Sequence, residues 1–340
     1  MPTLTATFEL EVSSPALLAI ADEKEPPEMR VVAMIESYKI DATLVPAWGW
    51  REKTKDDPLW TTGLALLRIA VSHDEAQDPP SVVETHDGKQ NYAAQGEYLY
   101  AKLPEYRRIA REAANRVLLF FRYKLLTPSI RLFPRWAQAL SSPIWFNSFG
   151  VELRGGRHTV VFQPVPGTRG ELCVQRLSVA DLTDLQAFIS TPEEPSLELT
   201  LLSDAQTAWF EKSLRRAVIE LAICTEVMVK RWIFPAASPA GAAFDYLEDR
   251  SKTSIKVLEL LDTVALEAFG RSYKQHAPHQ YRLLDYLFRC RNKVAHRAEL
   301  AYRDNGGELV SVDSKVIESW WLAVYHLKNW IHQPIPESEN

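Results

Sequence analysis

The stretch Phe288-Arg289-Cys290-Arg291-Asn292-Lys293-Val294-Ala295-His296-Arg297 combines a helical pattern with an unusual group of polar side chains. Apolar residues recur around it every three to four positions, the period that places side chains on one face of a helix. They are Tyr281, Leu284, Leu287, Phe288, Val294 and Ala295. A guanidinium, an amide and an imidazole stand close together in it, a combination that suits anion binding better than core packing. The stretch therefore predicts the end of a helix that carries a functional site.

The spacing of the polar residues limits how they can act together. Asn292 and His296 are four positions apart, so they lie above one another on one side of a helix. Arg291 and His296 are five positions apart, which corresponds to about 140° around an ideal helix. We therefore expect Arg291 and His296 to reach one ligand only at the last turn of the helix, or where a second copy of the helix faces the first.

The run from Arg291 to His296 resembles the signature of HEPN domains, an arginine separated by four to six residues from a histidine, with a polar residue directly after the arginine. The resemblance covers roughly the last 140 residues and leaves the first part of the chain unassigned. It implies a metal-independent endoribonuclease without a cofactor, which acts as a homodimer with facing motif helices. A toxin-like role, or a role in defence against phage, with an antitoxin or another regulatory partner, would fit such an enzyme.

The resemblance implies catalytic roles for Arg291, Asn292 and His296. An imidazole can take a proton from a ribose 2′-hydroxyl or donate one to the leaving 5′-oxygen near neutral pH. A guanidinium can hold the phosphate through two hydrogen bonds as charge builds up, and the amide can orient the imidazole or a phosphate oxygen. Cleavage of RNA would leave a 2′,3′-cyclic phosphate, and DNA would resist because it lacks the attacking hydroxyl.

The flanking cations Lys293, Arg297 and Arg303 are expected to bind neighbouring phosphates without reading bases. Glu226, on an earlier predicted helix, is a weaker candidate for an acidic residue that supports His296. Other acids could serve equally, and these are Glu220, Asp262 and Asp285.

A structural explanation stands beside the functional one. Basic side chains in the last turn of a helix interact favourably with the helix dipole, and Arg291 could simply pair with Glu220 or Glu226. A HEPN-like domain could also be non-catalytic and serve only in dimerisation or in nucleotide or RNA binding. No metal site is predicted, and the segment His73-Asp74-Glu75 is most simply a solvated acidic loop.

Composition bounds the class of protein. The 340 residues suffice for two domains, and the net charge of −5 argues against sequence-blind binding of nucleic acid over a broad surface. Three widely spaced cysteines predict no disulfide framework, which favours a reducing cytoplasm. No apolar stretch is long enough to span a bilayer, so we expect no membrane association.

The pattern of hydrophobic residues predicts an α+β protein with two domains. Residues 1–195 are predicted to form a β-rich domain with one long helix. This helix is expected from Leu103 to Leu126, with Pro104 at its start. We expect the domain to have a role in sensing, regulation or RNA selection. Residues 196–340 read as a HEPN-like bundle of four helices. These are expected at about 203–234, 255–269, 278–297 and 313–333.

Overall fold

The computed structural model describes residues 1–12, 16–21, 29–52, 59–134, 142–153, 161–162, 176–191, 194–235, 238–243, 246 and 256–333. The chain divides into two compact units, Met1–Glu194 and Pro195–Asn340. The first unit contains a mainly antiparallel sheet and the second contains helices, so the chain is a mixed α and β protein.

The sheet of the first unit is built around β1 (Thr3–Glu11) and β5 (Trp60–Asp74), which pair antiparallel over most of their length. The strand order is β3-β4-β5-β1-β8-β9, while β2 pairs with β5 and β10 pairs with β1 in parallel. The remaining strands of this sheet are β2 (Leu17–Ile20), β3 (Met29–Ile35), β4 (Tyr38–Glu52), β8 (Ile144–Phe146), β9 (Glu152–Leu153) and β10 (Val161–Phe162). A separate small hairpin joins β6 (Val83–Glu84) to β7 (Gln90–Asn91).

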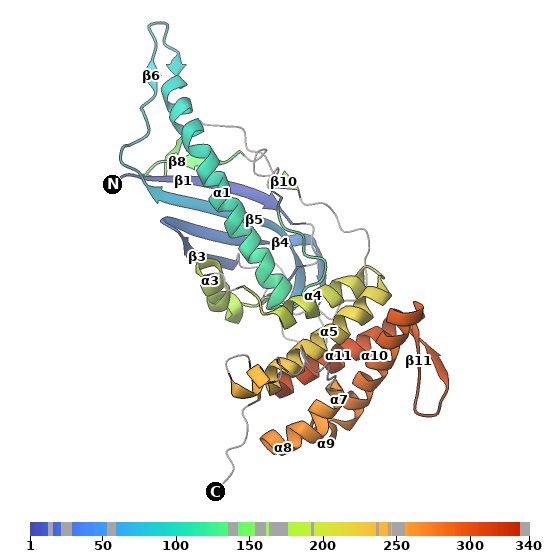
Figure 1. Ribbon diagram of the computed structural model, residues 1–340. Helices are drawn as coiled ribbons and strands as arrows, with labels where there is room; N and C mark the ends of the chain where they lie inside the picture. The colour runs from blue at the N-terminus through green and yellow to red at the C-terminus, as the bar shows by residue number, and fades with distance from the viewer. Residues whose placement is uncertain are drawn as a thin grey trace. The chain divides into compact units, whose positions relative to one another are not determined.

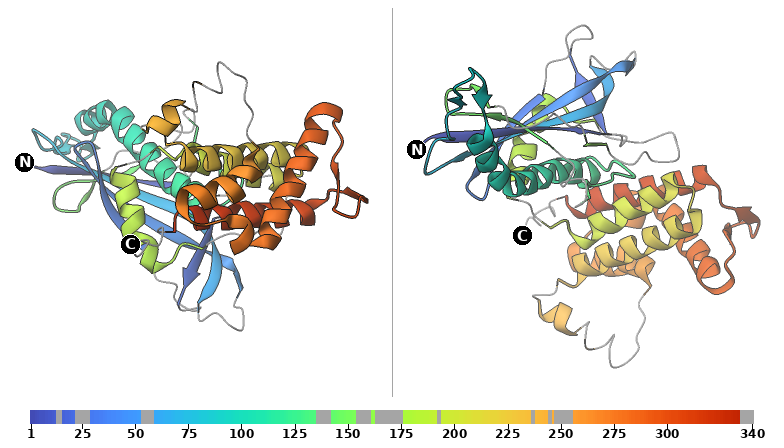
Figure 2. Two further views of the ribbon diagram at one scale, coloured as in Figure 1. Left: turned by 60° about the horizontal axis from the view of Figure 1, so that its bottom comes forward. Right: turned by 90° about the horizontal axis from the view of Figure 1, so that it is seen from above.

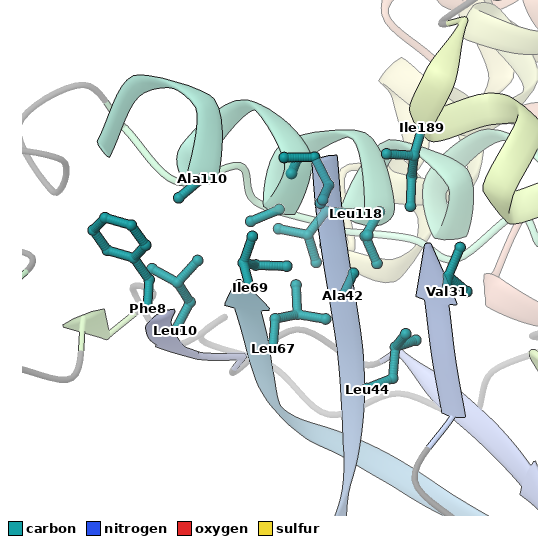
Figure 3. Close-up of a cluster of buried hydrophobic side chains, with 14 of the residues drawn as sticks. Phe8, Leu10, Val31, Ala42, Leu44, Leu67, Ile69, Ala110, Leu118 and Ile189 are labelled. Carbon is teal, nitrogen blue, oxygen red and sulfur yellow. The ribbon is translucent and has the colours of Figure 1, made fainter. Parts of the chain in front are cut away.

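Helix α1 (Ala93–Tyr123) runs across one face of the sheet (Figures 1 and 2). Buried and exposed residues alternate strictly along β3, as the two-residue period of a half-covered strand requires. Phe8, Ile69 and Ala42 point from the strands toward the side chains of α1 in Figure 3. Helix α3 (Leu182–Ser190), which follows the short helix η1 (Val179–Asp181), adds Ile189 to this core.

The start of α1 differs from the sequence prediction. The helix begins at Ala93 and contains Pro104 in its interior, whereas the sequence predicted a start at Pro104. Proline removes one helical hydrogen bond and normally ends a helix. Here Leu99 and Tyr106, on either side of the proline, are both buried, and this burial supports a continuous helix.

The second unit consists mainly of helices that pack on one another. Helix α10 (Pro278–Arg297) packs against α5 (Leu214–Ile233) and α11 (Ser314–Ile331), and α11 also contacts α5 and α4 (Leu197–Phe210). Between α5 and α10 lie α7 (Val257–Glu259), the π-helical turn η2 (Leu260–Val264), α8 (Ala265–Phe269) and α9 (Tyr273–His276). A hairpin of β11 (Ala301–Arg303) and β12 (Leu309–Ser311) connects α10 to α11.

The predicted helix over 203–234 is wrong, because two helices occupy this region. The chain leaves α4 through Lys212, which has a left-handed φ of 62°. The backbone N–H of Ser213 donates to the carbonyl of Ala208 at 2.8 Å, and that of Lys212 donates to the carbonyl of Trp209 at 3.0 Å. This hydrogen-bond pattern ends helices in the Schellman motif. A lysine instead of the usual glycine at the left-handed position hides the break from sequence inspection.

Candidate functional site

Helix α10 presents the motif, and its boundaries follow from local chemistry. Pro278 occupies the first helical position, where a missing N–H costs nothing. Leu284, Leu287 and Cys290 form its buried face. Ala298 closes the helix in a left-handed conformation with φ of 55°, a conformation that is costly for a residue other than glycine. The motif therefore lies in the last two turns of a helix that ends at a definite residue.

Arg291 lies at the border between the buried and the exposed side of α10. Its side chain is 36% exposed, and Nη2 lies 3.9 Å from Oε2 of Glu226 on α5. Its Nη1 also donates to Oδ1 of Asn292 at 3.2 Å. Glu226 has a closer partner on its own helix, since Lys230 Nζ lies 3.0 Å from Oε1. The pairing of Arg291 with Glu226 is thus present, but it is long and partly solvated.

His296 lies one turn beyond Asn292 and is exposed to solvent, as is Asn292. Within the described part of the chain, no side chain pairs or hydrogen-bonds with the imidazole. The structure therefore joins Arg291 and Asn292 by a hydrogen bond, and in the described residues no such bond links either of them to His296.

The three predicted phosphate-binding cations differ in their surroundings. Arg297 is exposed. Lys293 is mostly covered, and its Nζ lies 3.7 Å from Oε2 of Glu299. Arg303 donates from Nη1 to the carbonyl of Gly307 at 2.7 Å inside the β11–β12 hairpin. Lys293 and Arg303 are thus engaged by a carboxylate and a carbonyl, whereas Arg297 is exposed and no such contact is found for it in the described residues.

Of the four candidate acids, Glu226 is the one that lies beside the motif arginine. Glu220 pairs with Arg216 at 2.7 Å, and burial raises the pKa of its carboxyl. Asp262 pairs with Lys274 at 2.8 Å. Asp285 pairs with Arg289 of its own helix. Glu226 contacts Arg291 rather than His296, so it can act on the imidazole only indirectly.

A pocket of about 400 Å³ opens between α5, α7 and α10, beside Arg291 and Asn292. His296, Lys293, Arg297 and Arg303 do not line it. The lining consists of Glu226, Lys256, Val257, Leu258, Asp285, Phe288, Arg289, Arg291 and Asn292. Sequence inspection named Asp285 only as an alternative acid and missed Phe288 as a site residue, although Phe288 lies four positions before Asn292 on the same side of the helix.

Arg289 fixes the hairpin that follows the motif helix. Its Nη1 donates to the carbonyl of Arg303 at 3.1 Å, and its Nη2 donates to Oδ1 of Asn305 at 3.2 Å. Nη2 also lies 2.5 Å from Oδ2 of Asp285. These contacts from two directions hold the guanidinium of Arg289 at the edge of the pocket.

The first unit contains a second polar cluster, centred on the buried carboxylate of Glu75. Lys102 Nζ donates to Oε2 at 2.5 Å, and the Tyr106 hydroxyl donates to Oε1 at 3.0 Å. His73 Nδ1 lies 3.4 Å from the same carboxylate. The expectation of a solvated loop at this position is wrong, because His73 lies in strand β5 and Glu75 is 6% exposed. We interpret the cluster as a satisfied buried ion pair between the sheet and α1.

None of the family models, curated proteins or solved structures compared with the chain matches it. In the described ranges, no group of three or more His, Cys, Asp and Glu side chains could hold a metal ion. None of the helices described there is both long and apolar enough to cross a bilayer.

Proposed function

We propose that the second unit is a HEPN-type, metal-independent endoribonuclease domain. The observation that carries the proposal is the position of Arg291, Asn292 and His296 on the last two turns of α10, where the imidazole and the amide are exposed and the guanidinium is held only loosely. A phosphodiester of RNA supplies the negative charge that these groups would bind. His296 is exposed, so its side chain is open to solvent for proton transfer.

The proposal includes a homodimer. Arg291 lines the pocket and His296 does not, in line with their separation of about 140° around the helix. Two copies of α10 that face each other would bring His296 of one chain next to Arg291 of the other. A two-fold interface of this kind is the commonest form of homo-oligomer.

The proposed reaction assigns one role to each side chain. His296 removes the proton of the ribose 2′-hydroxyl, and the 2′-oxygen forms a bond to phosphorus while the bond from phosphorus to the 5′-oxygen breaks. The 5′-oxygen takes up a proton from a water molecule, and the imidazolium then releases its proton to solvent. Arg291 stabilises the charge on the phosphoryl oxygens, and Asn292 orients them. Arg297 holds a neighbouring phosphate. Lys293 would have to give up its contact with Glu299 to bind a phosphate, and Arg303 would have to give up its hydrogen bond to the carbonyl of Gly307.

The biological role follows as part of the same proposal. A domain that cuts RNA without a cofactor must be restrained in the cytoplasm, as in toxin-like proteins and in defence against phage. We assign the first unit to sensing a trigger, selecting RNA or binding an antitoxin or another regulatory partner.

The second candidate function is a non-catalytic module that binds a nucleotide or RNA end, or that only dimerises. The favouring observation is that Arg291 and Asn292 line the pocket while His296 lies outside it. A pocket that holds the arginine but not the proposed imidazole base would bind a phosphate without cleaving it.

The test incubates the full-length protein with single-stranded RNA and with DNA of the same sequence in the presence of a chelator. We expect cleavage of RNA alone, and a loss of at least a hundredfold in the His296→Ala variant, because general acid–base catalysis contributes about 10²- to 10⁴-fold. The matched control is His279→Ala, which removes an exposed histidine from the first turn of the same helix. Binding of RNA without cleavage, equal for both variants and wild type, would favour the non-catalytic module.

A further inference from the structure

One side of helix α10 carries both residues that line the pocket and residues of the motif. Asp285, Phe288, Arg289 and Asn292 all line the pocket, and their spacing of three or four positions places them in one stripe along the helix. His296 follows Asn292 by four positions and continues the same stripe beyond the pocket. Adjacent turns are about 5.4 Å apart along the axis. A ligand in the pocket beside Phe288 therefore ends within a turn or two of the proposed reaction site.

The apolar part of the pocket lining suits a flat ring. Val257 is buried, and Leu258 and Phe288 are half-buried, so the pocket has apolar surface from both α7 and α10. An aromatic side chain with an accessible face is a stacking surface for a nucleobase. A volume of about 400 Å³ is within the usual range of small-molecule sites.

The charged groups around this apolar surface match one base better than the others. Glu226 provides a carboxylate that accepts hydrogen bonds, and Lys256 provides a donor. Asp285 and Arg289, which pair with each other at 2.5 Å, provide a second carboxylate and the remaining N–H groups of a guanidinium. Guanine carries two neighbouring donors, N1–H and the N2 amino group, on one edge and two neighbouring acceptors, O6 and N7, on another. Adenine and cytosine carry a single amino donor beside a ring acceptor, which would repel the second oxygen of a carboxylate. Uracil has one ring N–H between two carbonyl oxygens.

The groups that would read the base are already held in position. Hydrogen bonds to the β11–β12 hairpin fix Arg289. Glu226 is held by Lys230 through Oε1, and its Oε2 faces Arg291 at the longer distance of 3.9 Å. Preorganised groups lose little conformational entropy when a ligand binds.

We propose that the pocket between α5, α7 and α10 binds a guanine base and selects the nucleotide next to the phosphate that is cut. Glu226 accepts from the Watson–Crick edge, Arg289 donates to O6 or N7, and Phe288 stacks on the ring. Selection of the nucleotide next to the cut phosphate rests on the proposed ribonuclease function, whereas binding of guanine by the pocket does not.

Calorimetry of the full-length protein with each of the four nucleoside 3′-monophosphates tests the pocket without requiring cleavage. We expect guanosine 3′-monophosphate to bind roughly tenfold or more tightly than the other three, as one specific paired contact predicts. Glu226→Gln should reduce this preference to less than about threefold, because an amide offers only one acceptor atom. The control Glu220→Gln, on the same helix and outside the pocket, should keep the preference.

Phe288→Ala provides a second variant. It should lower the affinity for all four nucleotides to a similar extent, because stacking does not distinguish bases strongly. Equal affinities for the four nucleotides in the wild type, or no binding, would overturn the proposal. Mapping the cut sites on RNA separates this inference from the function on which it rests. Cuts without a guanine preference would contradict guanine selection by the pocket but not the ribonuclease function. Selective binding of guanosine 3′-monophosphate without any cut would contradict the ribonuclease function but not guanine binding.

Discussion

The guanidinium of Arg291 lies 3.9 Å from the carboxylate of Glu226, and both side chains line the pocket between α5, α7 and α10. Both side chains are about one-third exposed, and a solvated pair at this distance contributes little to stability, typically less than about 1 kcal/mol. A phosphate can compete for such an arginine. The relationship between these two residues therefore favours a ligand-binding role for Arg291 over a structural one.

Replacing Arg291 should greatly reduce activity while leaving the stability of the protein almost unchanged. We expect Arg291→Ala to change the free energy of unfolding by less than about 1 kcal/mol, because the arginine contributes only a weak pair. Cleavage of RNA should fall by at least a hundredfold, and Arg291→Lys should restore little because an ammonium cannot form the two-pronged contact. Urea unfolding and a fluorogenic RNA assay measure the two effects. The control is Arg282→Ala, at an exposed arginine of the same helix; a comparable loss of activity there would argue against a specific role.

Mixing two inactive variants should restore activity if the site spans two chains. A mixed dimer of Arg291→Ala and His296→Ala chains retains one arginine and one histidine on different chains. Equal mixing makes about half of the dimers mixed, each with one intact pairing, so activity should recover to roughly a quarter of the wild-type value. The RNA assay after co-refolding or subunit exchange measures the recovery. No recovery, although light scattering shows dimers, would contradict a site shared between two chains.

The thiols of the helical unit should be unreactive. Burial raises the pKa of Cys290 to about 11 and that of Cys224 to about 12, so both remain protonated thiols at pH 8. Since the thiolate is the reactive form, iodoacetamide should modify neither residue in the folded protein and both after denaturation. Mass spectrometry of a Cys173→Ser variant gives the answer free of the third cysteine. Rapid labelling of Cys290 in the folded protein would mean that the motif helix opens.

The Glu75 cluster should make the first unit sensitive to acid. Burial alone would raise the pKa of this carboxyl, but the hydrogen bonds from Lys102 and Tyr106 outweigh burial and hold the pKa below its ordinary value. A lowered pKa in the folded state contributes stability at neutral pH, and this contribution is lost as the pH falls through the folded pKa.

Lys102→Met should therefore destabilise the first unit by about 1–3 kcal/mol at pH 7, because it leaves a buried carboxylate without its cation. The loss should shrink as the pH falls, because without Lys102 the buried carboxyl of Glu75 takes up a proton more readily than it does in the wild type. Hydrogen exchange of β1 and β5 measures this unit separately from the helices. Lys89→Met, which removes an exposed lysine, is the matched control. A loss that does not change with pH would contradict the assigned role of Glu75.

Periodic patterns in the sequence predicted those elements whose ends have clear chemical signals. Helix α10 begins at Pro278, and the helical segment ending at Phe269 is closed by Gly270 with φ of 66°, both as expected. Two predictions failed where tertiary packing or an unusual residue overrides the local signal. Pro104 lies inside α1 because its neighbours are buried, and Lys212 ends α4 in a conformation that usually requires glycine.

The candidate site was visible in the sequence only in part. The order of residues along α10 indicated that Arg291 and His296 point in different directions, and accordingly only Arg291 lines the pocket. The wall contributed by α7 could not be anticipated, because Val257 and Leu258 reach the site through tertiary packing. The burial of Glu75 was missed for the same reason, since its partners Lys102 and Tyr106 come from the distant helix α1.

The most direct test of the ribonuclease proposal is the chemical structure of the cut end. Mass spectrometry of the fragments that the wild-type protein releases from RNA in the presence of a chelator should show a 2′,3′-cyclic phosphate and a 5′-hydroxyl, and His296→Ala should release neither. Fragments that end in a 3′-hydroxyl and a 5′-phosphate, or the same fragments from His296→Ala at the wild-type rate, would contradict the proposal.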